Sequence, residues 1–167
     1  MASTMNNESV KQLLDDCESE IASLDTLVGG LGMTSNIVPY LSKYGLIKAC
    51  GTIEQAFKSI VADKCSYRAR QQIKNYLGEK VRNSSSNPSF SNICQLLKGF
   101  DLAWKVGFKD AVNAHPQADA LKTSLQSLVD ARNEFAHGGN PRIAIGDVVQ
   151  YYADARQVIE CLDQVIG

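Results

Sequence analysis

Apolar residues recur every three or four positions along nearly all of this chain, and that period limits its fold more than any other feature. The spacing matches one face of an α-helix, at about 3.6 residues per turn, and differs from the alternation of a β-strand. The clearest stripes cover 10–28, 46–60, 93–108, 121–135 and 148–166. The segment RIAI at 142–145 is too short to carry a sheet. We therefore predict one all-α bundle of about five to seven helices, a single domain over residues 1–167.

The predicted breaks between helices fall at segments rich in glycine, proline and small polar residues. GGLGMTSN at 29–36 ends the first helix, and Pro39 suits the first turn of the second. We expect a third helix over 67–81. Its apolar face would consist of Ile73, Tyr76, Leu77 and Val81. The polar loop RNSSSNPS at 82–89 is the best candidate for a mobile tip, and Gly99 interrupts the next stripe, so a short helix should join a longer one there.

The bulk composition excludes several classes of protein. Hydrophobic content of 44% and charged content of 21% are ordinary for a globular domain, and no apolar run could cross a bilayer. The N-terminal residues lack the order of a signal peptide, so we expect a cytoplasmic protein with no membrane partner. The five cysteines form no C-x-x-C pair and the chain has two histidines. We therefore predict neither a metal site nor a cofactor.

Charge is distributed unevenly although the net charge is only −1. Residues 1–25 hold six acidic residues and one lysine, whereas residues 58–82 hold seven basic residues and two acidic ones. The basic segment supplies four candidates for phosphate contacts to RNA, which are Lys64, Arg68, Arg70 and Lys74. Two other interpretations stay open: a solvated helix face, or a surface that meets the acidic first helix.

The segment ARNEFAHGGN at 131–140 contains the most informative polar residues. Arg132 falls in the middle of the apolar arc of its predicted helix. That arc is formed by Leu121, Leu125, Leu128 and Phe135. An unpaired buried guanidinium is too costly to keep. Arg132 therefore has a carboxylate partner, or its arc faces a cleft or a subunit interface.

His137 stands where this helix should end, because two glycines and then Pro141 follow it. On an ideal helix its side chain would project about 140° away from Arg132. Two interpretations fit this position. His137 is a helix-end residue that interacts with the dipole, or it is a proton-transfer group that reaches Arg132 once the helix has ended.

Three segments resemble HEPN domains, a family of helical nucleotide-binding and RNA-cleaving proteins. LVDARNEFAHGG at 128–139 is similar to the family's Arg…His motif. NPSFSNICQLLKGFDLAWKVGF at 87–108 and LIKACGTIEQAF at 46–57 resemble the branch named RiboL-PSP. The resemblance implies an all-α domain and, in many members, metal-independent endoribonuclease activity. It also implies homodimers that bring two motifs together, and a role as a toxin or antiphage effector with an antitoxin or regulatory protein as partner.

The resemblance assigns motif positions to Arg132, Asn133 and His137, and less directly assigns Glu54 as the residue that supports Arg132. For Glu54 the alternative is a solvent-facing helix carboxylate. Some members carry a tyrosine two places after the histidine that a partner enzyme modifies, and here Gly139 stands at that place.

The residue types suit cleavage of RNA without a metal. Histidine exchanges protons near neutral pH, and arginine presents paired donors to phosphate oxygens. The leading hypothesis is therefore a dimeric endoribonuclease. The alternative is a non-catalytic HEPN module that binds RNA, a nucleotide or a partner protein, and a plain helical scaffold would require the motif to be coincidental.

Overall fold

A computed structural model describes residues 5–32 and 34–167 of the chain. Residues 1–4, part of the predicted domain, and Met33, in the predicted break at 29–36, lie outside the described residues. The described part holds seven α-helices, a short π-helical segment and no strand. In chain order the elements are α1 (Glu8–Leu31), α2 (Val38–Ser66), α3 (Gln71–Leu77), η1 (Gly78–Arg82), α4 (Phe90–Phe100), α5 (Leu102–Ala114), α6 (Ala118–Ala136) and α7 (Ile145–Ile166).

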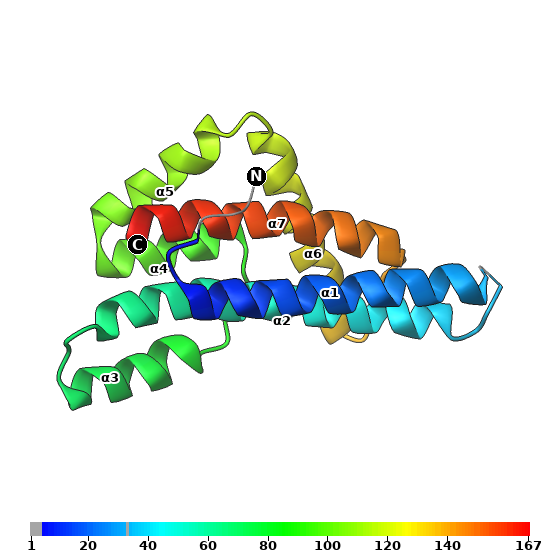
Figure 1. Ribbon diagram of the computed structural model, residues 1–167, viewed down its shortest axis with the longest axis horizontal. Coiled ribbons are helices and arrows are strands. Elements are labelled where there is room, and N and C mark those ends of the chain that lie inside the picture. Colours follow the sequence, from blue (N-terminus) through cyan, green and yellow to red (C-terminus); the bar gives the residue numbers. More distant parts are fainter. Residues whose placement is uncertain (1–4, 33) are drawn as a thin grey trace.

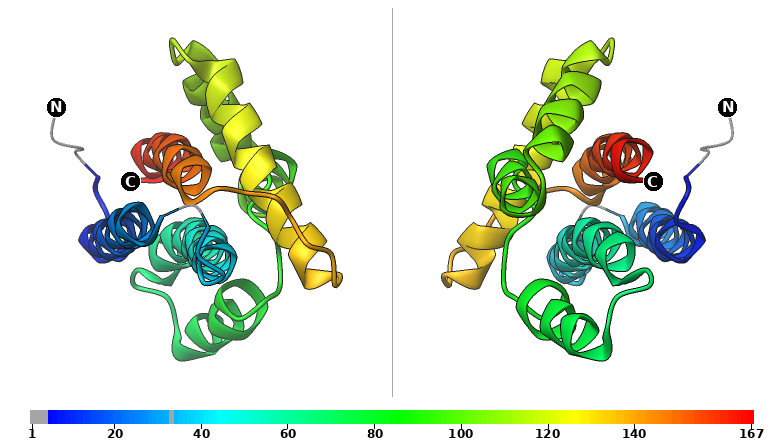
Figure 2. Two further views of the ribbon diagram at one scale, coloured as in Figure 1. Left: turned by 90° about the vertical axis from the view of Figure 1, so that its right-hand side faces the viewer. Right: turned by 90° about the vertical axis from the view of Figure 1, so that its left-hand side faces the viewer.

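The three long helices α1, α2 and α7 pack on one another and run side by side along the molecule (Figure 1). Viewed along the long axis they form one group, with α6 crossing obliquely beside them and α3 lying below α2 (Figure 2). The stripes predicted on α2 and α7 are buried throughout, whereas on α1 Leu13, Leu24 and Val28 are only partly buried. On α7, for example, the entire predicted stripe is buried: Val148, Tyr152, Ala155, Ile159, Leu162 and Ile166.

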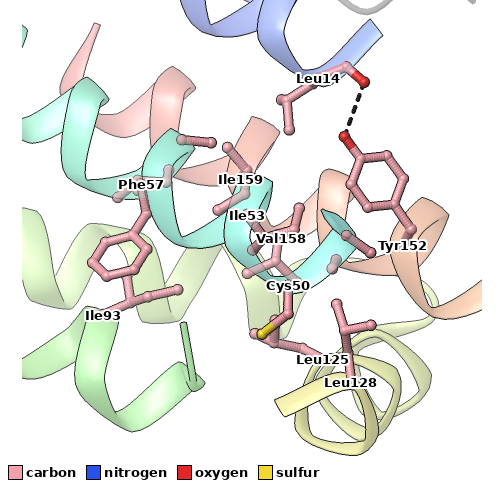
Figure 3. Packing of buried hydrophobic residues seen from close by; sticks show 14 of the residues in the cluster. Leu14, Cys50, Ile53, Phe57, Ile93, Leu125, Leu128, Tyr152, Val158 and Ile159 are labelled. Atoms are coloured by element: carbon pink, nitrogen blue, oxygen red, sulfur yellow. Dashed lines mark hydrogen bonds between the residues drawn. The ribbon is translucent and has the colours of Figure 1, made fainter. Parts of the chain in front are cut away.

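The core forms where α2, α6 and α7 meet. Cys50 and Ile53 of α2 pack with Leu125 and Leu128 of α6, and the side chains interdigitate as Figure 3 shows. Across the same core the Tyr152 hydroxyl donates a hydrogen bond of 2.9 Å to a backbone carbonyl of α1. The core therefore fixes α6, the helix that carries the motif, against the rigid group of long helices.

The stripe over 93–108 divides into α4 and α5 as expected, but the break lies at Asp101 and not at Gly99. Asp101 has an extended backbone, and its side chain accepts a hydrogen bond of 2.7 Å from the Ala103 N–H at the start of α5. An aspartate that caps a helix in this way ends the preceding helix more firmly than a glycine that is merely tolerated within one. The sequence signal for the break was therefore the cap residue.

The prediction for 67–81 is corrected in two respects. The helical part starts at Gln71, and its last turn widens into η1. Leu77 and Val81 are buried as expected, but Ile73 and Tyr76 are about half exposed or more, at 50% and 61%. Among the helices α1 to α7, α3 packs mainly on α2, so it buries a narrower stripe than a helix enclosed on several sides. No described helix has the length and apolar character needed to span a membrane.

Candidate functional site

The end of α6 is set by the two glycines that follow His137. Gly138 adopts a φ of +82°, a conformation that favours glycine. Its N–H donates to the Phe135 carbonyl at 3.1 Å, and the Gly139 N–H donates to the Glu134 carbonyl at 2.8 Å. A Cβ on Gly139 would lie 2.7 Å from that same carbonyl oxygen, so a side chain there would force the backbone to move. The position that holds a modifiable tyrosine in some HEPN proteins therefore has no room for a side chain here.

This helix end presents the His137 side chain to solvent. His137 is the C-terminal cap residue of α6, and its backbone N–H still donates to the Asn133 carbonyl at 3.0 Å. The side chain itself is exposed. Its position is thus fixed by the backbone of the capping turn while its imidazole remains free to meet a ligand.

Arg132 and Asn133 lie one turn earlier on α6 and are half-buried. The Arg132 guanidinium donates a hydrogen bond of 3.3 Å to the Asn133 side-chain oxygen. Cys50 lies within reach of the arginine's charge: burial raises the pKa of the Cys50 thiol to about 12, and the charge of Arg132 opposes that rise. Arg132 therefore stands at the edge of the core and not within it, although its place in the middle of the apolar arc predicts burial. Phe135, predicted for the same arc, is 38% exposed.

Arg132 reaches into a hollow of about 570 Å³ between α6, α4 and the loop that precedes α4. We call this space the Arg132 hollow. It is lined by Ser84–Ser86, Asn87, Asn92, Gln95, Leu96 and Arg132. Among the described residues, Arg132 is the only charged one in this lining and no carboxylate is part of it, so the hollow offers one cation among neutral hydroxyl and amide groups and one leucine. Such a lining suits an anionic or polar ligand.

Glu54 contributes to this site in a different way from the one predicted. Its carboxylate forms an ion pair with Lys58, one turn later on α2, and no ion pair joins it to Arg132 in the described part of the chain. The Lys58 ammonium also donates to the Ser84 carbonyl, and Glu54 accepts a hydrogen bond of 3.1 Å from the Ser86 N–H. The pair therefore holds the serine loop that forms one wall of the Arg132 hollow.

These bonds also change the interpretation of the loop at 82–89. Besides its ties to α2, Ser84 donates through its hydroxyl to the Val81 carbonyl at 2.8 Å, and Pro88 is buried. A segment predicted as a mobile tip is thus bonded at both ends. Its serines and asparagine, together with Asn92 and Gln95 on α4, were not predicted as site residues. The available signal was the polar loop itself, followed by two amides three positions apart on one helix face.

The four basic candidates all lie on exposed surface at or after the end of α2. We call Lys64, Arg68, Arg70 and Lys74 the basic arm. None of the four forms an ion pair in the described residues. No ion pair joins the basic segment to the acidic first helix in the described residues, since α1 pairs its carboxylates with Arg156 of α7 and with Lys48 of α2. The two do lie close together, because Lys64 shares a surface pocket with Glu8, and Arg82 shares another with Asp16. The four side chains are exposed, although Lys64 donates a hydrogen bond of 3.2 Å to the Gly167 carbonyl and the Arg68 guanidinium lies 5.0 Å from the centre of the Tyr67 ring.

Exposed apolar side chains lie beside the motif end of α6. Phe135 and Tyr40 are both exposed, and the Lys43 ammonium lies 5.7 Å from the first ring and 5.9 Å from the second. Ile47, one turn further along α2, is 40% exposed. We call Tyr40, Ile47 and Phe135 the apolar rim. It offers a surface that another protein chain could cover.

The family model described as RiboL-PSP-HEPN matches residues 10–167, so this chain belongs to that family. The match covers every helix that forms the Arg132 hollow and the motif end of α6. No curated protein and no solved structure matches the chain.

Proposed function

We propose that this RiboL-PSP-HEPN protein is a metal-independent endoribonuclease that acts as a homodimer through Arg132, Asn133 and His137. One observation carries the proposal: a half-buried arginine opens into a polar hollow without carboxylates, and an exposed histidine is fixed at the end of the same helix. Membership of a family that includes ribonucleases supports it. We extend the proposal to a role as a toxin or antiphage effector restrained by an antitoxin or another regulatory protein.

The reaction assigned to these residues is a transesterification within RNA, in which the 2′-oxygen of a ribose replaces the 5′-oxygen of the next nucleotide on phosphorus. One histidine removes the proton of a ribose 2′-hydroxyl, and the resulting oxygen attacks the adjacent phosphorus. The bond from phosphorus to the 5′-oxygen breaks, and a second proton donor protonates the leaving oxygen. Arg132 binds the phosphate oxygens and stabilises the charge that develops on them, while Asn133 orients Arg132. The products carry a 2′,3′-cyclic phosphate and a 5′-hydroxyl.

The need for two proton-transfer groups favours a dimer. Within one chain the His137 side chain is exposed, and it does not line the Arg132 hollow. A second copy would supply a second histidine, and the apolar rim beside the motif gives such a copy a surface to cover. We expect Phe135→Lys to place a charge in this interface, so the variant should be monomeric and should lose cleavage while keeping its fold. A wild-type protein that is monomeric by light scattering at micromolar concentration and still cleaves RNA would contradict this arrangement.

The proposed reaction is tested directly by incubating purified protein with RNA in the presence of a chelator. The proposal expects cleavage to persist and the products to end in a 2′,3′-cyclic phosphate. A non-catalytic module that binds RNA, a nucleotide or a partner is the second candidate, and one observation favours it: His137 stands outside the hollow that Arg132 lines. Absence of cleavage together with RNA binding that depends on Arg132 would establish that candidate.

A further inference from the structure

We infer that the Arg132 hollow is a subsite for one unpaired nucleobase of RNA, whose edge is recognised by Asn92 and Gln95. The inference rests on the proposed function, since it assigns the base beside the phosphate that Arg132 binds. It also names the part of the RNA that the hollow would hold, a single base that is not paired with another strand.

The lining of the hollow has the chemistry that a nucleobase requires. Its volume of about 570 Å³ lies within the range of roughly 300–1,000 Å³ typical of sites for small ligands. Leu96 is half-buried and gives the lining one apolar side chain, on which a flat base could pack. The remaining residues apart from Arg132 are neutral hydroxyls and amides, which match the uncharged donors and acceptors of base edges. A basic amino-acid side chain would find no opposite charge in this lining, and an acidic one would find only Arg132.

Two of the amides are held in place before any ligand binds. The Asn92 side-chain nitrogen donates to the Asn87 side-chain oxygen at 2.7 Å and to the Asn87 carbonyl at 3.1 Å. The Ser89 N–H donates to the same Asn87 side-chain oxygen at 3.3 Å. Asn92 thus uses both donors of its amide, and within the described residues its side-chain oxygen keeps its accepting capacity. A group fixed in this way loses little conformational entropy when it binds a ligand.

Gln95 supplies the complementary groups one helical turn further along α4. Its side chain is exposed and forms no hydrogen bond with the described residues, so it offers both a donor and an acceptor. Base edges present a donor beside an acceptor, and single side-chain amides pair with such edges through two hydrogen bonds. In a duplex these edges are paired, and the deep, narrow major groove of A-form RNA keeps side chains away from them. The hollow therefore selects an unpaired base.

The test uses His137→Ala protein, so that RNA is bound without being cut. The probe is a fluorescent single-stranded hexaribonucleotide, compared with the same strand carrying one abasic residue at each position in turn, and with its duplex. We expect one abasic position to weaken binding at least fivefold and the duplex to bind more weakly still. Gln95→Leu should reduce that fivefold difference to less than twofold, and Asn92→Leu should do the same if its thermal melt shows an intact fold.

Gln164→Leu is the matched control, because Gln164 is exposed on α7 and does not line the hollow. It should leave the difference between intact and abasic strands unchanged. The inference is overturned if every abasic strand binds as tightly as the intact one, if the hexamer does not bind, or if folded Gln95→Leu protein keeps the full difference. Failure of the proposed function looks different: wild-type protein would cut no RNA, while the base-dependent binding and its loss in Gln95→Leu would remain.

Discussion

The pair of Glu54 and Lys58 offers the sharpest test of how the site is held together. Both side chains are largely removed from solvent, at 16% and 5% exposure, and both bond to the serine loop. Lys58→Met leaves the Glu54 carboxylate buried with only the Ser86 N–H as a partner among the contacts described. Removing one member of a buried pair costs roughly 3–5 kcal/mol, and the residual exposure of Glu54 places this case near the lower end, at about 3 kcal/mol.

A double-mutant cycle measured by urea unfolding gives the energy of the interaction itself. Glu54→Gln removes the charge but keeps an acceptor for the Ser86 N–H, so Lys58→Met combined with Glu54→Gln should recover about 2 kcal/mol of the loss. For a domain of this size Lys58→Met alone should lower Tm by about 6–12 °C. RNA binding should weaken in the same variant below its Tm, because the loop that walls the hollow is released.

The control is Lys48→Met, which breaks the pair between Lys48 and Glu20 on the surface of α1 and α2. Those side chains are 41% and 35% exposed, and pairs of this kind contribute about 0.2–1 kcal/mol. The reasoning is refuted if Lys58→Met and Lys48→Met lower the free energy of unfolding equally, or if the coupling between Glu54 and Lys58 is below about 0.5 kcal/mol.

Two further predictions concern the helix end and the basic arm. Gly138→Ala should lower the free energy of unfolding by about 1–2 kcal/mol, because Gly138 has a φ of +82°, which is unfavourable for alanine. The variant should keep most of the cleavage activity, since the new Cβ would meet open space. Gly139→Ala should instead lower the cleavage rate at least tenfold, because the clash with the Glu134 carbonyl displaces the turn that holds His137. Thermal melts and initial cleavage rates of both variants check this difference. Equal activity of the two variants would contradict it. Neutralising the basic arm should weaken RNA binding without altering sequence preference and should flatten the dependence of log K on log salt, whereas an unchanged slope would mean that the arm is only a solvated surface.

The sequence predicted the long helices well because each of them packs on more than one other helix, so the burial of its apolar residues shows as a regular stripe. It failed at α3 for a physical reason: Ile73 and Tyr76 have helical spacing, but spacing says which residues share a face and not whether another helix covers that face. Phe135 at the end of α6 is a similar case, since it continues a buried stripe past the point where the core ends.

The site was predictable only where its chemistry is local. Arg132, Asn133, His137 and the glycine cap follow from one short segment, and the structure positions the helix end as its residues indicate. The partner of Glu54 was also local, because a lysine four residues later on the same helix is an ordinary ion-pair partner. The wall formed by Ser84–Ser86 could not be predicted in this way, since a contact between that loop and α6 depends on how α2 and α4 pack.

The central claim is tested most directly by RNA cleavage in a chelator with three proteins: wild type, His137→Ala and His115→Ala. His115 is the matched control, because it is the other histidine of the chain and its ring nitrogen accepts a hydrogen bond of 3.1 Å from the Gln117 N–H at the start of α6. The account predicts that wild type and His115→Ala cut RNA to products with 2′,3′-cyclic phosphate ends. His137→Ala should melt within a few degrees of wild type, since an exposed helix-end charge contributes only about 0.3–1 kcal/mol, and should not cut. Cleavage by folded His137→Ala at the wild-type rate would contradict the account.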